Sequence, residues 1–428
     1  MSRSSLFITA LTLGAALAAP AFADSATIAS VKQQAPQRTT LTGDWGGLRT
    51  RLQADGITVR GDYVSESFAV ADGGLRSGAA YTQQVRAGLD FDMGRIAGWS
   101  GAKLHLTLND RRGKGLSSDY VGNRLPIQEA YGGQYTRLSE LSYEQDFSGG
   151  DVNLRLGYFA MGNDLGGVAA GCTFVNAAFC AHPLSMSGDS NWYNYPNARW
   201  GGALRVRARR DLLVRTGVFQ VNPALGQEGK AFKPFAGDTR GAVLPLEVEY
   251  TPGQSPGDHA LPGSYKLGLY YDTADATRTP GPDPVDSRIG YYALMSQTVW
   301  RATDSRRSLA VIGAVTANPR TAAQITRWYM AGLVQTGTFS GRDQDVLGLG
   351  VVHAQLNPRL RDALIGAGPG APDAPPAGET VVEASYAVQI QPWLVVKPDV
   401  QYVIHPGAFS NRNIDDALAL GVQVKAQF

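Results

Sequence analysis

Two glutamates, Glu140 and Glu144, stand four residues apart in TRLSELSYEQ and have the residue types of a glycosidase carboxylate pair. In an extended strand, residues four apart share one face, where paired charges also occur simply as part of a wetted wall. The sequence contains five histidines but no nucleophile elbow, zinc-binding motif or phosphate loop. These features predict a protein that is not an enzyme.

Cys172 and Cys180 lie eight residues apart in GCTFVNAAFCAHP, a segment whose Gly and Ala content is typical of a loop. In an oxidising compartment they are expected to close a small disulfide-bonded loop. The alternative is a metal site that includes His182, although two cysteines and one histidine form an incomplete zinc set. The sequence predicts no metal and no cofactor.

Residues 1–23, MSRSSLFITALTLGAALAAPAFA, combine one arginine, an apolar stretch from Leu6 to about Ala19 and the small–x–small sequence AFA. This pattern predicts a secretory signal peptide cleaved after Ala23. An uncleaved anchor is disfavoured because the apolar run is shorter than the ~18 residues of a spanning helix. No later apolar stretch reaches that length, so the mature chain is predicted to be exported without a spanning helix.

Charged and apolar residues alternate along much of the chain. Arg205, Arg207 and Arg209 alternate with apolar residues and would share one face of a strand. Against lipid each arginine would cost ~2–4 kcal/mol, so this face is expected to meet water. The arginines could attract anions or simply keep a pore wet.

The same alternation recurs in sixteen segments, joined by connections that are alternately tight, as at 210–211, and long, as at 161–198. Many segments are close to the ~9–11 residues that a tilted strand needs to cross a bilayer. The predicted strands are 57–68, 79–92, 101–110, 137–147, 151–160, 199–209, 212–221, 241–250, 264–273, 288–300, 308–318, 326–338, 345–355, 380–391, 393–404 and 416–428.

Lipid outside and water inside explain the two faces of these strands better than a soluble β-sandwich, which rarely needs so many strands of similar length. Within hydrocarbon every backbone polar group must be paired, so the sheet has to close on itself. Closure also explains why the chain ends in the strand ALALGVQVKAQF, which would pair with the first strand. We therefore predict an all-β, sixteen-stranded antiparallel transmembrane β-barrel over 56–428.

Residues 24–55 are predicted to be an N-terminal segment that ends in a short helix at 44–55. Thr42 or Asp44 would cap the helix and Gly56 would end it. We expect this helix at the periplasmic mouth of the barrel. The formal net charge of +2 gives no reason to expect a nucleic-acid partner.

Several stretches, in order along the chain, resemble the carbohydrate-selective porins of the OprB family from Gram-negative outer membranes. They are LTGDWGGLR at 41–49, LPIQEAYGG at 125–133, TRLSELSYEQ at 136–145, NWYNYP at 191–196 and PWLVVKPDVQYVIHPG at 392–407. The resemblance implies a sixteen-stranded barrel, an inward-folded loop that narrows the pore, and passive uptake of sugars such as glucose. The final Phe428 resembles the signal read by the barrel assembly machinery.

By motif position, the resemblance implies that Arg111, Glu129 and Arg137 line the constriction, with Trp192 as a further candidate. Guanidinium donors and a carboxylate acceptor could bind sugar hydroxyls while an aromatic ring covers the apolar face of the sugar. Each residue has an alternative interpretation. Arg111 and Arg112 could be a solvated strand end, Glu129 could pair with Arg137, and Trp192 could be packing beneath loops or part of an interfacial belt.

The sequence thus predicts an outer-membrane porin for passive, carbohydrate-selective diffusion, with a general or anion-selective diffusion porin as the alternative. Expected partners are monosaccharides and small oligosaccharides, outer-membrane lipid and the barrel assembly machinery, and the barrel could be a monomer or a homotrimer. Solute binding must stay weak because a tightly held solute blocks its own channel. Arg112 and Ser142 depart from the residues usual in the family and leave the width and preference of the pore open.

Overall fold

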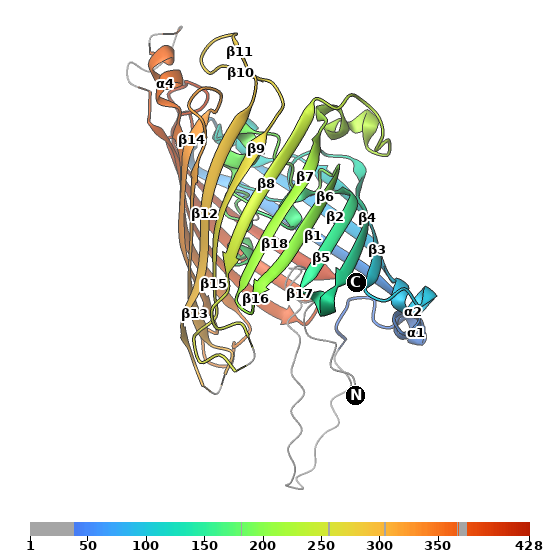
Figure 1. Ribbon diagram of the computed structural model, residues 1–428. Helices are drawn as coiled ribbons and strands as arrows, with labels where there is room; N and C mark the ends of the chain where they lie inside the picture. Colours follow the sequence, from blue (N-terminus) through green and yellow to red (C-terminus); the bar gives the residue numbers. More distant parts are fainter. Residues whose placement is uncertain (1–37, 181, 256, 304, 366, 368–374) are drawn as a thin grey trace.

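The structure, a computed structural model, describes residues 38–180, 182–255, 257–303, 305–365, 367 and 375–428. Sixteen strands form one closed antiparallel barrel in which each strand pairs with its sequence neighbours and β18 pairs with β1 (Figure 1). The predicted fold class is therefore confirmed. The predicted signal peptide, residues 1–23, lies outside the described residues.

The predicted strand segments correspond one to one with the barrel strands, and only the end of β1 differs by more than three residues. The barrel strands are β1 (Ile57–Gly74), β2 (Gly78–Asp92), β3 (Ala102–Gly113), β4 (Thr136–Phe147), β5 (Val152–Phe159), β6 (Arg199–Arg209), β7 (Leu212–Val221), β8 (Gly241–Tyr250), β9 (Gly263–Asp272), β12 (Arg288–Arg301), β13 (Ser308–Ala317), β14 (Ile325–Thr336), β15 (Val346–Leu356), β16 (Gly378–Gln391), β17 (Leu394–Ile404) and β18 (Asp415–Gln427).

The remaining elements lie in the connections and before the barrel. They are the hairpin β10 (Ala276–Thr277) and β11 (Pro284–Val285), the helices α1 (Leu48–Ala54), α2 (Met93–Ala97), α3 (Leu184–Asp189) and α4 (Pro358–Leu364), and the short turns η1 (Trp45–Gly47), η2 (Ser117–Val121), η3 (Ser148–Gly150), η4 (Met161–Asn163), η5 (Ala169–Thr173), η6 (Pro223–Gly226) and η7 (Glu228–Lys230). None of the described helices combines the length and apolarity needed to cross a membrane.

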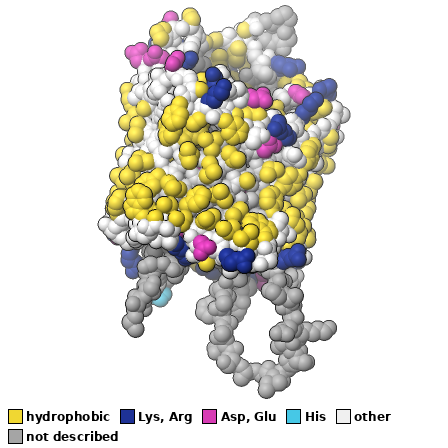
Figure 2. All heavy atoms as spheres, turned by 90° about the vertical axis from the view of Figure 1, so that its right-hand side faces the viewer, with side chains coloured by type: hydrophobic (Ala, Val, Ile, Leu, Met, Phe, Trp, Pro, Cys, Tyr) yellow, Lys and Arg dark blue, Asp and Glu magenta, His cyan; other side chains and the backbone are white. Residues whose placement is uncertain are grey.

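Side chains alternate between the interior and the outer surface of the barrel, because successive residues of a strand point to opposite faces. In β14, Trp328 and Met330 are 0% and 7% exposed, whereas Tyr329 and Leu333 are 45% and 44% exposed. Figure 2 shows the result on one side of the molecule: hydrophobic side chains cover the middle of the wall, and charged side chains gather toward its two ends. This outer surface suits a hydrocarbon environment.

Strands β1 and β18 close the barrel. Asp62 pairs with Gln427 at one end of this seam, and the N–H of Phe428 donates to the carbonyl oxygen of Gly61 at 3.0 Å. A Cβ at position 61 would lie 2.7 Å from Cδ2 of the Phe428 ring, so glycine allows the ring to cover β1. The last strand therefore pairs with the first, as the sequence predicts.

Pro398 lies within β17, a position that an interior strand rarely tolerates because proline has no N–H to donate. The pairing of β16 with β17 is interrupted there, passing from Ser385–Asp399 directly to Val388–Val396. The gap in the β16–β17 hydrogen-bond ladder therefore includes Pro398, the residue that has no N–H to donate to it.

The predicted N-terminal helix is present as η1 and α1. Asp44 directly precedes η1, and its Oδ1 accepts hydrogen bonds from Thr50 N and Oγ1 of α1 at 2.9 and 2.8 Å, while Gly47 stands at the N-cap of α1. Figure 1 shows α1 beside α2 at one rim of the barrel, and Arg95 Nη1 joins the two helices by donating to Gln53 O at 2.9 Å. The rim that carries α1 and α2 also carries the tight connections, which is the arrangement expected at the periplasmic side.

Candidate functional site

Two connections fold into the barrel and occupy much of its interior: residues 114–135 between β3 and β4, and residues 160–198 between β5 and β6. We call them the first and second inward segments. Their apolar side chains pack with inner-wall residues into one buried cluster. Members from the two segments that are at most 1% exposed include Leu116, Val121, Leu125, Ile127, Met161, Phe174, Val175, Phe179, Met186 and Trp192.

Carboxyl groups of the wall bind backbone N–H groups of these segments. Glu379 of β16 accepts from Arg124 N and Leu125 N at 2.7 and 2.8 Å. Other wall carboxyls act similarly: Glu66 of β1 accepts from Ala130 N at 3.0 Å, Glu247 of β8 from Gly166 N at 2.8 Å, Asp272 of β9 from Asn191 N at 3.1 Å, and Glu383 of β16 from Val175 N and Asn176 N at 2.5 and 3.0 Å.

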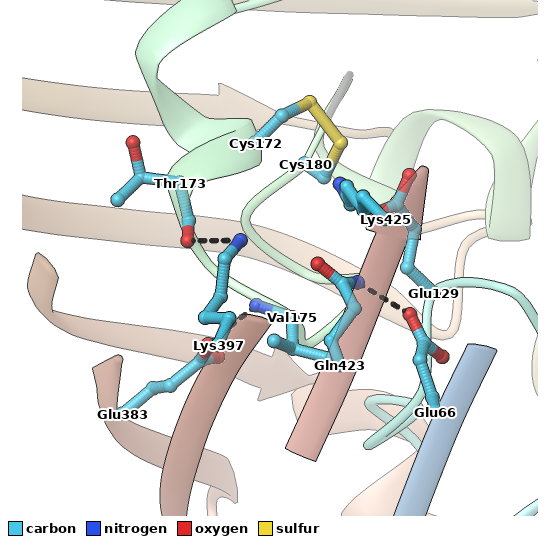
Figure 3. Close-up of a disulfide and its surroundings, with 10 residues drawn as sticks. All are labelled: Glu66, Glu129, Cys172, Thr173, Val175, Cys180, Glu383, Lys397, Gln423 and Lys425. Carbon is cyan, nitrogen blue, oxygen red and sulfur yellow. Dashed lines mark hydrogen bonds and ion pairs between the residues drawn. A yellow bond between two sulfur atoms is a disulfide. The ribbon is translucent and has the colours of Figure 1, made fainter. Parts of the chain in front are cut away.

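A disulfide closes the part of the second inward segment that lies against β16 and β17 (Figure 3). The S–S bond joins Cys172 and Cys180, the pair expected from the sequence, so neither sulfur is a free thiol in the structure. Inside the disulfide loop, the rings of Phe174 and Phe179 stack with centroids 4.4 Å apart. The Lys397 ammonium donates to Thr173 O at 2.7 Å.

The inner faces of β1 to β8 carry charged side chains that pair across strands and, through Asp164, with the second inward segment. Glu140 and Glu144 belong to this wall, the first bound to Arg155 and the second 3.3 Å from Nε2 of His105. Ser142 fits between such charges, since its hydroxyl donates to Glu140 Oε1 at 2.8 Å. Further pairs are Arg60–Asp90 at 2.6 Å, Arg86–Asp62, His105–Asp90 at 2.7 Å, Arg155–Asp164 at 3.1 Å, Arg205–Asp146 at 3.9 Å and Arg215 with Glu247 and Glu249 at 3.1 and 2.5 Å.

The predicted arginine face of β6 also meets ion pairs rather than the apolar outer surface. Arg205 lies near Asp146 on the inner wall, Arg207 is 3.7 Å from Asp151, and Arg209 pairs with Asp211 at 2.6 Å at the exposed turn. These contacts favour the interpretation that the arginines keep the wall wet.

Arg111 is 8% exposed, so it is not the solvated strand end considered as the alternative. Its Nε donates to Gln84 Oε1 at 2.9 Å, and its Nη1 donates to Tyr131 O at 3.1 Å. Arg112 points the other way: its side chain is 53% exposed and pairs with Asp110 at 2.8 Å. The wall thus directs Arg111 toward the first inward segment.

Glu129 lies on the first inward segment, and its side chain is 32% exposed. Its carboxylate is 3.9 Å from the ammonium of Lys425 on β18, whose side chain is 34% exposed. Among the described residues, Lys425 rather than Arg137 is therefore the ionic partner of Glu129. Figure 3 shows Glu129 and Lys425 close together, next to the Glu66–Gln423 hydrogen bond.

Arg137 is 4% exposed and its guanidinium is held by loop groups. It donates to Asn197 Oδ1 and to Gly133 O, the latter at 3.0 Å. It also lies over the ring of Tyr135, 4.0 Å from the ring centroid. Arg137 therefore joins the ends of the two inward segments to β4.

Trp192 is 1% exposed and does not present its ring to the lumen. It packs edge-on against Tyr270 and Tyr292 of the wall, with ring centroids 5.8 and 5.9 Å away. Its other aromatic neighbour is His182, whose ring centroid lies 6.3 Å away. This environment corrects the expectation of a sugar-covering ring and supports the packing alternative.

Two titratable groups of the second inward segment have pKa values displaced by burial. The buried His182 imidazole has no hydrogen-bond partner on either ring nitrogen among the described residues, and burial lowers its pKa to about 3. Asp189 of α3 accepts from Gln324 N and Ile325 N at 2.6 and 2.9 Å. Burial raises the pKa of this carboxyl to about 6, although both hydrogen bonds act in the opposite direction.

Sequence reasoning missed Arg86, Lys425 and the wall carboxyls as site residues. Arg86 is 31% exposed while paired with Asp62. The available signal was alternation, since Lys425 stands on the polar face of VQVKAQF. Its contact with a residue almost 300 positions earlier in the chain could not be inferred from that pattern.

The arrangement provides a water-exposed set of donors and acceptors beside two packed segments, rather than a catalytic centre. Within the described part of the chain, no group of three or more His, Cys, Asp and Glu side chains is placed to hold a metal ion. Glu129 can accept hydrogen bonds, whereas Lys425 and Arg86 can donate them. Such a set can exchange partners with a hydroxylated solute.

Comparison with known proteins gives consistent matches over most of the chain. A family model described as carbohydrate-selective porin, OprB family, matches residues 76–428. The chain is 30% identical over 426 residues to Porin B of Pseudomonas aeruginosa, with 92% of each chain covered. It is 27% identical to the putative porin QuiX of Acinetobacter baylyi, covering 91% of this chain and 93% of that protein. The high-pH structure of Pseudomonas putida OprB superposes with a TM-score of 0.84 at 29% identity, covering 92% of this chain and 99% of that one.

Proposed function

This chain belongs to the carbohydrate-selective porin family OprB, and we propose that it passes small sugars, glucose among them, through a constriction bordered by Arg111, Glu129 and Lys425. The family and the barrel make it an outer-membrane channel rather than an enzyme. Diffusion is passive, carbohydrate-selective and driven by the solute gradient. The signal peptide at 1–23 and recognition of Phe428 by the barrel assembly machinery are proposals for how it reaches that membrane.

The observation that carries the constriction is the partly exposed pair Glu129–Lys425, with side chains 32% and 34% exposed and a Glu129 Oε2 that has no hydrogen-bond partner among the described residues. A sugar hydroxyl can donate to Glu129 and another can accept from Lys425 or Arg86, so hydration is exchanged for equivalent bonds. Because these groups remain partly hydrated, binding stays weak, in the millimolar range or about 4 kcal/mol. Weak binding permits rapid exit on either side.

The test is sugar-dependent blocking of single-channel current in planar bilayers. We expect Glu129→Gln and Arg111→Ala each to weaken glucose block by up to about tenfold, which corresponds to a loss of about 1.4 kcal/mol of binding free energy. Arg112→Ala is the matched control, because Arg112 is the neighbouring arginine and pairs with Asp110 on the other face. Equal glucose block in all four proteins would remove these residues from the constriction.

An anion-selective porin remains the second candidate, and one observation favours it. Among the described residues, the partners of Arg111, Arg137 and Arg199 are amide, carbonyl and aromatic groups rather than carboxylates. Unpaired arginines raise the local concentration of anions. Reversal potentials in a salt gradient, measured with chloride and phosphate, distinguish the two: strong anion selectivity without glucose block would support the alternative.

A further inference from the structure

Two glutamates on one face of β16 hold both inward segments. Glu379 binds Arg124 N and Leu125 N of the first segment at 2.7 and 2.8 Å. Glu383, four residues on, binds N–H groups of the second segment at 2.5 and 3.0 Å. Both glutamates are at most 1% exposed, and Figure 3 shows Glu383 beside Val175 of the disulfide loop.

The second segment depends on such side chains for its position. Over residues 164–180 and 182–191, none of the backbone–backbone hydrogen bonds joins the segment to a barrel strand. The wall instead contributes side chains: besides Glu383, the Ser385 hydroxyl and the Lys397 ammonium both donate to Thr173 O, at 3.1 and 2.7 Å. The wall itself is fixed by its closed ladder of strand pairs.

We propose that Glu379 and Glu383 are positioning residues that set the size limit of the pore. By fixing both segments inside the barrel, they hold them as a rigid inner border that limits the width of the water-filled space. The proposal rests on the proposed function only in requiring that the lumen conducts. It does not require glucose to be the solute.

Glu379→Gln and Glu383→Gln each replace one acceptor oxygen by an amide group that donates, directly opposite a backbone N–H. One of the two bonds is then lost and the buried N–H is left without its partner. We expect single-channel conductance to rise by about half or more, with larger open-channel noise, because the released segment no longer confines the pore. In liposome swelling, uptake of a neutral trisaccharide relative to glucose should rise at least about twofold.

Glu249→Gln is the matched control. Glu249 is also a buried wall carboxylate, but its described partners, Arg215 and Ser264, belong to the wall. It should leave the trisaccharide-to-glucose ratio unchanged. Folding of each variant is checked by the heat-dependent electrophoretic mobility of the barrel.

Val175→Pro tests the same contact from the loop side if a Glu variant fails to fold. It removes the N–H that Glu383 binds without altering a strand, so it should raise conductance and trisaccharide uptake as well. Folded variants with unchanged or reduced conductance and an unchanged size limit would overturn the proposal. If glucose does not block the current through the wild type, the proposed sugar function is refuted. The size-limit proposal is tested separately, because conductance and swelling do not depend on glucose block.

Discussion

At the scale of single residues, His182 makes the second inward segment sensitive to acid. Its imidazole is buried beside Trp192, and burial lowers its pKa to about 3. An unfolded histidine has a pKa of about 6.5, so the released segment binds a proton that the docked segment excludes. The stability of the docked state is therefore fully present above pH ~6.5 and decreases as the pH falls from there toward 3.

The thermal midpoint of the near-ultraviolet circular dichroism signal, to which the buried Trp192 contributes, measures this effect between pH 7 and 4. We expect the midpoint of the wild type to fall with acidification and that of His182→Phe to fall less, because phenylalanine keeps an aromatic ring and does not titrate. Equal pH slopes for the two proteins would show that His182 does not control docking.

Residue chemistry was only partly predictable from sequence. Arg111 points inward, as the motif implies, and it binds Tyr131 of the first inward segment. The role of Trp192 could not be inferred, because the sequence does not say which wall residues will enclose a loop tryptophan. Glu129 meets Lys425, a contact between opposite ends of the barrel sequence that arises only when β18 closes the wall.

At the scale of elements, the disulfide should stabilise the loop between Cys172 and Cys180 and leave the barrel unaffected. Closing so short a loop is expected to contribute about 2–3 kcal/mol by reducing the entropy of the undocked segment. The double variant Cys172→Ser/Cys180→Ser should therefore be cleaved faster by protease within 160–198, while the electrophoretic mobility of the folded barrel stays the same. Equal cleavage rates would mean that the wall contacts alone hold the loop.

Strands were the most predictable elements because alternation is a local property that the lipid–water boundary enforces along every one of them. The end of β1 was underestimated, since AVADGG lacks a clear alternation and extends the strand only by pairing with neighbours, as Val70 does with Gly78 and Ala419. A single inward-folded loop was expected, and only from the family resemblance, whereas two segments fold inward. Their paths depend on contacts with distant wall residues such as Glu379, which leave no periodic signal in the sequence.

At the scale of the whole molecule, the outer surface must remain apolar for the barrel to stay in hydrocarbon. Leu267, at the middle of β9, is 66% exposed on this surface, whereas its neighbour Lys266 lies inside, 3.9 Å from Glu247. Leu267→Arg should lower the free energy of unfolding in lipid vesicles by about 2–4 kcal/mol, as measured by urea titration. Lys266→Arg keeps a cation on the inner face and is expected to change the free energy of unfolding little. Similar decreases in the free energy of unfolding in both variants would contradict the assignment of the two faces.

Side chains of β8, β9 and β16, together with Glu66 of β1, hold the two inward segments, whereas most of the cross-strand charge pairs lie on β1 to β8. A diffusing solute can therefore follow one hydrated wall, along which positively and negatively charged side chains alternate. Neighbouring strands are about 4.8 Å apart, which is comparable to the width of a sugar ring. The hydroxyls of a sugar can therefore form hydrogen bonds to the side chains of one strand as they release those of the strand before it. Passage then proceeds through a series of weak binding sites along the wall, and none of these sites needs to bind the solute tightly.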